Sequence, residues 1–186
     1  NWVIHEACRQ LRSWHLQGHE NWSVAVNLSA LQFEQNSLVE TVVTALEQHH
    51  IPPHLLTLEV TETTAMRDPD ESVRILTALT DLGVRASIDD FGTGYSSLSY
   101  LQTLDVDTLK IDKSFVDTLE YKPLTPHIIE MAKSLNLAIV AEGVETPAQR
   151  DWLRAHGVNY AQGWLYCKAL PKEEFIQWAE HNIKTH

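Results

Sequence analysis

The chain has 186 residues, of which 44% are hydrophobic and 21% charged, an ordinary composition for a globular protein with one sizeable core. Its formal net charge of −11 argues against a surface that wraps long nucleic acid, which needs a basic face. The two cysteines, Cys8 and Cys167, have neither zinc-site spacing nor a disulfide framework, so we expect a reducing, cytosolic compartment.

The chain alternates strand and helix patterns from its first residues. It opens on the helical pattern NWVIHEACRQLRSW without an initiator methionine, so we expect a fragment of a longer protein. No run is long enough for a membrane helix and no signal peptide is visible. Strands are expected at 23–29, 55–62, 84–90, 107–112, 137–143 and, more weakly, 159–164. Further helices are expected at 37–50, 70–82, 122–135, 147–156 and 172–181.

This alternation, with strands apolar on both faces, predicts an α/β protein built on a parallel sheet. Six strands fit either an open doubly wound sheet or most of a barrel. The positions of the polar residues favour a TIM-type barrel, because barrel enzymes build their sites from the carboxyl ends of several strands. The residues at those ends are Asn27, Glu59, Asp89, Asp90, Lys110 and Glu142.

The acidic residues among them have two readings each. Glu59 lies inside a strand with Leu58 and Val60 on either side, so it needs a buried partner. A salt bridge and a metal or catalytic role are equally good explanations. Asp89 and Asp90 are either two turn residues in water or a pair that serves two cations about 3.5–4 Å apart.

The remaining polar residues also have ordinary alternatives. Asn27 fits a turn or a helix cap, and Glu62 fits the first turn of a helix. Lys110 could point into the barrel mouth or pair with Asp112, which lies two residues later on the same face. Gln162, on the last visible strand, could be an ordinary loop residue.

The last acidic pair follows the fifth strand. Glu142 and Glu145 could cap the helix that starts near Pro147, and Glu145 fits that role better. Taken together, the strand-end residues offer amide and carboxylate oxygens without Cys or His, a set that favours Mg²⁺ or Mn²⁺ over zinc. Such a site with one lysine predicts metal-dependent hydrolysis of a phosphate ester.

Six motifs in order resemble one known family. The segments VNLSA, LEVTET, IDDFGTGYSSLSYL, LKIDKSFV, VAEGVET and YAQGWLY closely resemble the EAL domain family of bacterial cyclic di-GMP phosphodiesterases. The resemblance covers essentially the whole chain, so it implies a single EAL domain over residues 1–186. The family fold is a modified TIM-type (β/α)8 barrel whose first strand is antiparallel to the others.

The resemblance also implies roles for the polar residues. Two ions, Mg²⁺ or Mn²⁺, would activate a water that opens cyclic di-GMP to linear pGpG. The metal ligands would be Asn27, Glu59, Asp89, Asp90 and Glu142. The catalytic residues would be Glu59, Lys110 and Glu142. The substrate-binding residues would be Asp112, Gly143 and Gln162. Glu62 and Glu145 would anchor loops, Glu62 holding the DFGTG loop that couples the site to dimerisation in this family.

The sequence departs from the family in lacking the E-A/V-L motif of the first barrel strand. Because a typical barrel of about 250 residues exceeds this chain by roughly 60, we expect an N-terminal truncation and little hydrolase activity from this fragment alone. The segment DTLEYKPLTPHIIEMAK resembles a subgroup with a periplasmic CSS sensor. That likeness implies an inner-membrane parent with this domain in the cytoplasm. A homodimer is expected through the face near 95–101. The alternative function is a catalytically inactive module that binds cyclic di-GMP or a protein.

Overall fold

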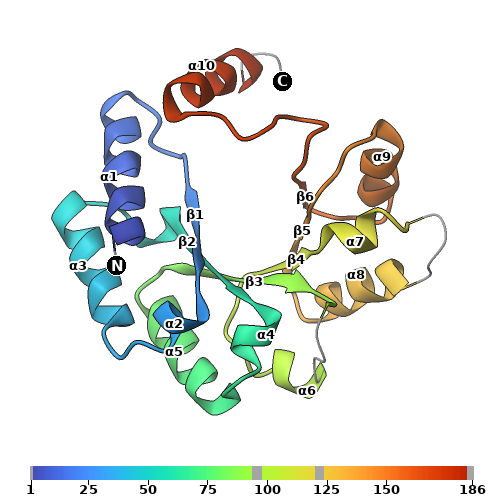
Figure 1. The fold of residues 1–186 in the computed structure, drawn as a ribbon, viewed down its shortest axis with the longest axis horizontal. Coiled ribbons are helices and arrows are strands. Elements are labelled where there is room, and N and C mark those ends of the chain that lie inside the picture. The colour runs from blue at the N-terminus through green and yellow to red at the C-terminus, as the bar shows by residue number, and fades with distance from the viewer. Residues whose placement is uncertain (1, 94–97, 120–123, 184–186) are drawn as a thin grey trace.

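The computed structural model describes residues 2–93, 98–119 and 124–183 (Figure 1). Its sheet has six strands in the order β1 to β6, and every neighbouring pair is parallel. The strands are β1 Val24–Leu28, β2 Leu56–Thr61, β3 Arg85–Phe91, β4 Thr108–Ile111, β5 Ala138–Ala141 and β6 Tyr160–Ala161. The α/β prediction and all six expected strands are therefore confirmed.

The sheet curls, and the helices lie outside it (Figure 1). The longer helices are α1 Trp2–Leu16, α3 Leu38–His49, α5 Pro69–Asp81, α8 Leu124–Ser134, α9 Pro147–Ala155 and α10 Lys172–Ile183. Short helices follow several strands: α2 Ala30–Phe33, α4 Glu62–Ala65, α6 Leu98–Leu101 and α7 Lys113–Val116, with a 3-10 turn η1 at Pro53–Leu55. This is the arrangement of a TIM-type barrel, with β1 and β6 as the two edges of the sheet that the structure describes.

Some sequence predictions fall partly outside the described residues. The dimer face expected near 95–101 is described only from residue 98 onward, and the first two residues of the helix expected at 122–135 are not described. The antiparallel first strand of the family has no counterpart among the strands that are described, so it stays a prediction.

The two faces of the sheet differ in polarity, which corrects the expectation of strands apolar on both faces. The outward side chains Leu58, Ile88 and Leu109 are at most 2% exposed and form the core with the helices. Alternation turns their neighbours Glu59 and Ser87 inward. The inner face therefore carries the polar residues, and the helix-covered face carries the core.

Local signals explain where the helices begin and end. Asp68 caps α5 by accepting a hydrogen bond from the Glu71 amide, and Pro69 is the first residue of that helix. Thr146, and not Glu145, is the N-cap of α9, where it forms a capping box with Gln149. None of the helices in the described ranges has both the length and the apolarity that a membrane crossing needs.

The last helix returns to the first. From β6 the chain runs back so that α10 lies beside α1 (Figure 1). The ring of Phe175 on α10 lies 5.6 Å from that of Trp14 and 5.7 Å from that of Trp22, measured between centroids. Aromatic packing thus joins the two ends of the described chain.

Candidate functional site

A bulge in β3 brings two adjacent carboxylates to the inner face. Ile88 pairs with Leu109 and Phe91 with Ile111, so Asp89 and Asp90 together face the single intervening residue of β4. Asp90 has a positive φ of 54°, which few residues other than glycine, asparagine and aspartate adopt readily. This extra residue interrupts the alternation, so both aspartates reach the same site.

Lys110 of β4 lies at the centre of this site. Its Nζ is 2.7 Å from Glu59 Oε2, 2.8 Å from Glu142 Oε1 and 3.1 Å from Asp89 Oδ1. The Lys110 side chain is only 6% exposed. The alternative pairing with Asp112 is wrong, because the Asp112 carboxylate caps α7 by accepting from the Ser114 amide. Carboxylates from β2, from β3 and from the residue after β5 thus meet at the ammonium group of Lys110 on β4.

The protonation behaviour of the site reflects burial and crowding. Burial lowers the pKa of Lys110, but its hydrogen bonds to Glu142 and Glu59 outweigh this and hold the pKa above the ordinary value. Burial raises the pKa of Glu142 against the opposing effect of Lys110. Burial and the neighbouring Asp89 raise the pKa of Asp90. One lysine therefore does not neutralise the carboxylates around it.

The donor set fits a hard divalent cation. Carboxylate oxygens of Asp89, Asp90 and Glu142 all lie within 4.8 Å of one another. With Glu59, the cluster holds four carboxylates, three of them in contact with Lys110, and its formal charge is −3 when all are ionised. Oxygen ligands and excess negative charge are what Mg²⁺ and Mn²⁺ sites require.

Two further predicted residues lie at the edge of this cluster. Asn27 of β1 is the register partner of Glu59, and it is exposed. Glu62, at the start of α4 and only 1% exposed, accepts a hydrogen bond of 2.7 Å from the Gly92 amide. A Cβ at Gly92 would lie 2.6 Å from the Phe115 ring, so this turn depends on glycine. The roles predicted for Asn27 and Glu62 stay predictions.

A cavity of about 630 Å³ opens beside the cluster. Glu142, Gly143 and Gln162, three predicted residues, all line it. Lys168 and Trp164 line it too, with the Lys168 Nζ 4.9 Å from the centre of the Trp164 ring. Sequence reasoning missed this pair, although the exposed aromatic residues of QGWLY, directly after the last strand, were a usable signal.

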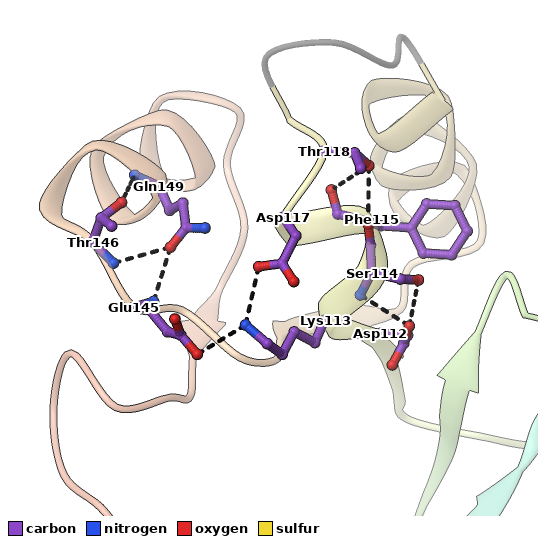
Figure 2. A network of polar contacts seen from close by, with 9 residues as sticks. All are labelled: Asp112, Lys113, Ser114, Phe115, Asp117, Thr118, Glu145, Thr146 and Gln149. Carbon is purple, nitrogen blue, oxygen red and sulfur yellow. Dashed lines mark hydrogen bonds and ion pairs between the residues drawn. The ribbon is translucent and has the colours of Figure 1, made fainter.

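Lys113, another residue that sequence reasoning missed, also lines the cavity and packs against Gly143. Its Nζ lies 2.8 Å from Glu145 Oε1 and 3.0 Å from Asp117 Oδ1 (Figure 2). Glu145 thus binds the first residue of α7, and its predicted loop-anchoring role stays a prediction.

Comparison with known proteins places these features in a family context. The EAL domain model matches residues 1–169. "Probable cyclic di-GMP phosphodiesterase PdeB" of Escherichia coli is 48% identical over 181 residues, covering 97% of this chain and 35% of that protein. The Pseudomonas aeruginosa protein "Bifunctional diguanylate cyclase/cyclic di-GMP phosphodiesterase MucR" is 50% identical over 179 residues, covering 94% of this chain and 26% of that protein. The chain therefore spans only about a quarter to a third of these two relatives.

Solved structures show the same fold. "PaMucR Phosphodiesterase, c-di-GMP complex" superposes with a TM-score of 0.90 at 50% identity, covering 94% of this chain and 72% of that one. The EAL domain of Mycobacterium smegmatis DcpA gives a TM-score of 0.89 at 37% identity, covering 96% of this chain and 83% of that one.

Proposed function

Because this chain belongs to the EAL domain family, we propose that residues 1–186 form one domain of a phosphodiesterase that hydrolyses cyclic di-GMP to linear pGpG. The observation that carries the proposal is the cluster of Asp89, Asp90 and Glu142, whose carboxylate oxygens lie within 4.8 Å of one another around the end of β3. The similarity to PdeB, named a probable cyclic di-GMP phosphodiesterase, and to MucR, named a bifunctional diguanylate cyclase and cyclic di-GMP phosphodiesterase, supports the choice of substrate.

Two Mg²⁺ or Mn²⁺ ions complete the proposed site. Its ligands are Asn27, Glu59, Asp89, Asp90 and Glu142. When bound, such a pair of ions lowers the pKa of water and neutralises charge on a phosphodiester. The formal excess of negative charge around Lys110 supports this assignment, because the carboxylates need further cations.

The chain's own residues hold and orient the reactants. Lys110 donates to Glu59 and Glu142 and forms an ion pair with Asp89, so it fixes these carboxylates and places a positive charge beside the substrate phosphate. Water adds at phosphorus while one P–O bond of the ring breaks. The leaving oxygen takes a proton and becomes a ribose hydroxyl, and the other product end is a phosphate monoester, which gives pGpG.

The substrate's remaining parts lie against the neighbouring cavity. Gln162 and Gly143 line that cavity beside Glu142 and offer an amide side chain and backbone polar atoms. Asp112 follows β4 directly and completes the proposed substrate contacts. The volume of about 630 Å³ is in the range of small-molecule sites.

We also propose a wider setting for the domain. The contact from Gly92 to Glu62 supports a role for Glu62 in anchoring the loop after β3, and Glu145 acts likewise through Lys113. The domain forms a homodimer through the face near 95–101, and it lies in the cytoplasm as part of an inner-membrane sensor protein. A monomer at all concentrations in sedimentation contradicts the dimer.

The decisive experiment measures hydrolysis of cyclic di-GMP by the full-length protein with Mg²⁺ or Mn²⁺. We expect linear pGpG as the product, its loss on adding EDTA, and its loss in Glu59→Gln and Asp89→Asn. Glu173→Gln, which changes an exposed carboxylate 3.5 Å from Lys172, serves as the control and keeps full activity. Binding of cyclic di-GMP without turnover contradicts the enzyme and indicates a receptor module.

A further inference from the structure

Lys113 connects two segments that lead into the candidate site. It is the first residue of α7, two residues after β4. Its ammonium group donates to Asp117, at the end of α7, and to Glu145, which lies just before α9 (Figure 2). The lysine therefore ties the segment after β4 to the segment after β5.

The stem of the same side chain covers Gly143. A Cβ added at Gly143 would lie 2.6 Å from both Cβ and Cδ of Lys113 and would also meet its Cγ. Gly143 has a φ of 66°, so this position favours glycine for two separate reasons. The residue that precedes it is Glu142, and the aliphatic stem thus packs on the backbone next to a carboxylate of the site.

The backbone on both sides of Gly143 is already fixed. The Glu142 amide donates to the Ile111 carbonyl at 3.0 Å, and the Val144 amide donates to the Gln162 carbonyl at 2.9 Å. Gly143 is the link between these two anchors, and Lys113 lies directly against it. Lys113 therefore contacts the one residue between the two anchored positions, next to Glu142.

We propose that Lys113 is a positioning residue for Glu142, in which the stem covers Gly143 and the ammonium group restrains Glu145. Together these contacts hold the Glu142 carboxylate against Asp89 and Asp90. The catalytic consequence rests on the proposed function, whereas the effect on the carboxylate cluster does not. Residues behind metal ligands typically change metal affinity or activity about 10- to 100-fold when they are replaced.

Three variants separate the two contacts. Lys113→Ala removes the stem and the charge, Lys113→Met keeps an unbranched stem without the charge, and Lys113→Arg keeps both. Lys172→Met is the matched control, because Lys172 is an exposed lysine with an ion-pair partner, Glu173, at 3.5 Å. All are measured in the full-length protein.

We expect Lys113→Ala to lower Mn²⁺ affinity, titrated without substrate, by about 10-fold or more. The same variant lowers kcat for cyclic di-GMP by a similar factor, because Glu142 is displaced. Lys113→Met gives a smaller loss in both quantities and stands in for the alanine variant if that one does not fold. Lys113→Arg keeps most of the Mn²⁺ affinity and most of the kcat, and Lys172→Met matches the wild type in both quantities.

Amide hydrogen exchange supplies a readout that needs neither metal nor substrate. The Val144 amide, bonded to Gln162, exchanges faster in Lys113→Ala than in the wild type if the lysine restrains this turn. If folded Lys113→Ala and Lys113→Met keep wild-type Mn²⁺ affinity, kcat and Val144 exchange, Lys113 is an ordinary surface ion pair and the proposal is wrong. A wild-type protein without turnover refutes the phosphodiesterase alone, because the exchange measurement still decides the role of Lys113.

Discussion

At the scale of single residues, the Asp90 carboxylate lowers the stability of the folded state at neutral pH but supplies a ligand for the proposed metal site. Burial and the adjacent Asp89 raise the pKa of this carboxyl above its ordinary value of 3.8. The folded state therefore keeps the Asp90 proton up to a higher pH than the unfolded chain does. The stability that this group contributes is present below its ordinary pKa, and it is lost as the pH rises through the pKa of Asp90 in the folded protein.

Replacing Asp90 with asparagine tests this balance. Asparagine also tolerates the positive φ of 54° found here. In metal-free buffer at pH 7 we expect Asp90→Asn to raise the unfolding midpoint by about 1–3 °C and to weaken Mn²⁺ binding by at least about 10-fold. Calorimetry with and without Mn²⁺ checks both effects. A metal-free variant less stable than the wild type contradicts the argument.

Lys110 has the opposite effect on stability, because its positive charge offsets the repulsion between the carboxylates that it contacts. Lys110→Met leaves Glu59, Asp89 and Glu142 without their shared partner. We expect the free energy of unfolding to fall by about 3–5 kcal/mol, the usual cost of an uncompensated buried charge. Added Mg²⁺ recovers part of this loss. In urea titrations the exposed control Lys172→Met changes stability by no more than about 1 kcal/mol, and an equally small effect at Lys110 contradicts the prediction.

At the scale of elements, the segments after β5 and β6 are fastened to each other through backbone contacts. Gln162 accepts from the Val144 amide at 2.9 Å, and Val144 accepts from the Leu165 amide at 3.0 Å. Gly163 lies between them, where an added Cβ would be 2.8 Å from the Val144 carbonyl carbon and closer still to its oxygen and nitrogen. These are backbone atoms that cannot rotate away.

We therefore expect Gly163→Ala to destabilise the protein by about 1–3 kcal/mol, the cost typical of overpacking. It also weakens cyclic di-GMP binding, because Gln162 is displaced. Gly18→Ala is the control, since Gly18 has a φ of 92° but no atom within 4 Å of the new Cβ. Thermal unfolding of both variants separates the steric clash from backbone strain, and equal losses contradict the steric explanation.

The sequence predicted regular elements well and local irregularities poorly. The six strands and the longer helices have periodic apolar patterns that extend over enough residues to be recognised. Helices α2, α4 and α7 have only four residues each, too few for a helical period. The bulge at Asp89 and Asp90 was invisible, because neither residue demands a positive φ.

Side-chain partners were the least predictable part of the site. Spacing left open whether Lys110 points into the barrel mouth or pairs with Asp112, and only the register of the sheet brings residues from three other strands or strand ends to it. Lys113 was missed because its importance depends on packing against Gly143, thirty residues later in the chain. Such contacts follow from the curvature of the sheet, which no local pattern encodes.

At the scale of the whole molecule, the two cysteines lie in different environments. Cys8 is fully buried in α1, and burial raises the pKa of its thiol from 9.0 to about 11. Cys167 is half-buried and lines the cavity beside Glu142. Only the second is therefore open to reagents in the native protein.

We expect a thiol reagent to modify one cysteine per native chain and both after denaturation, and Cys167→Ser to abolish the native reaction.

Between pH 9 and 11 the unfolded chain loses its Cys8 proton while the folded one keeps it. Stability therefore falls as the pH rises, by at most about 1.4 kcal/mol per pH unit. Cys8→Ala reduces this slope in urea titrations, whereas equal reactivity of both native thiols contradicts the burial argument.

The bulge in β3 also has a meaning for the evolution of such sites. Because Phe91 returns to the outward face after the extra residue, one inserted codon creates a second inward carboxylate while the packing downstream keeps its frame. We expect removal of that codon to restore a regular strand with a single inward acid and Phe91 still facing the core. Gain and loss of a two-carboxylate strand end are thus one indel apart, with no need to redesign the barrel around it.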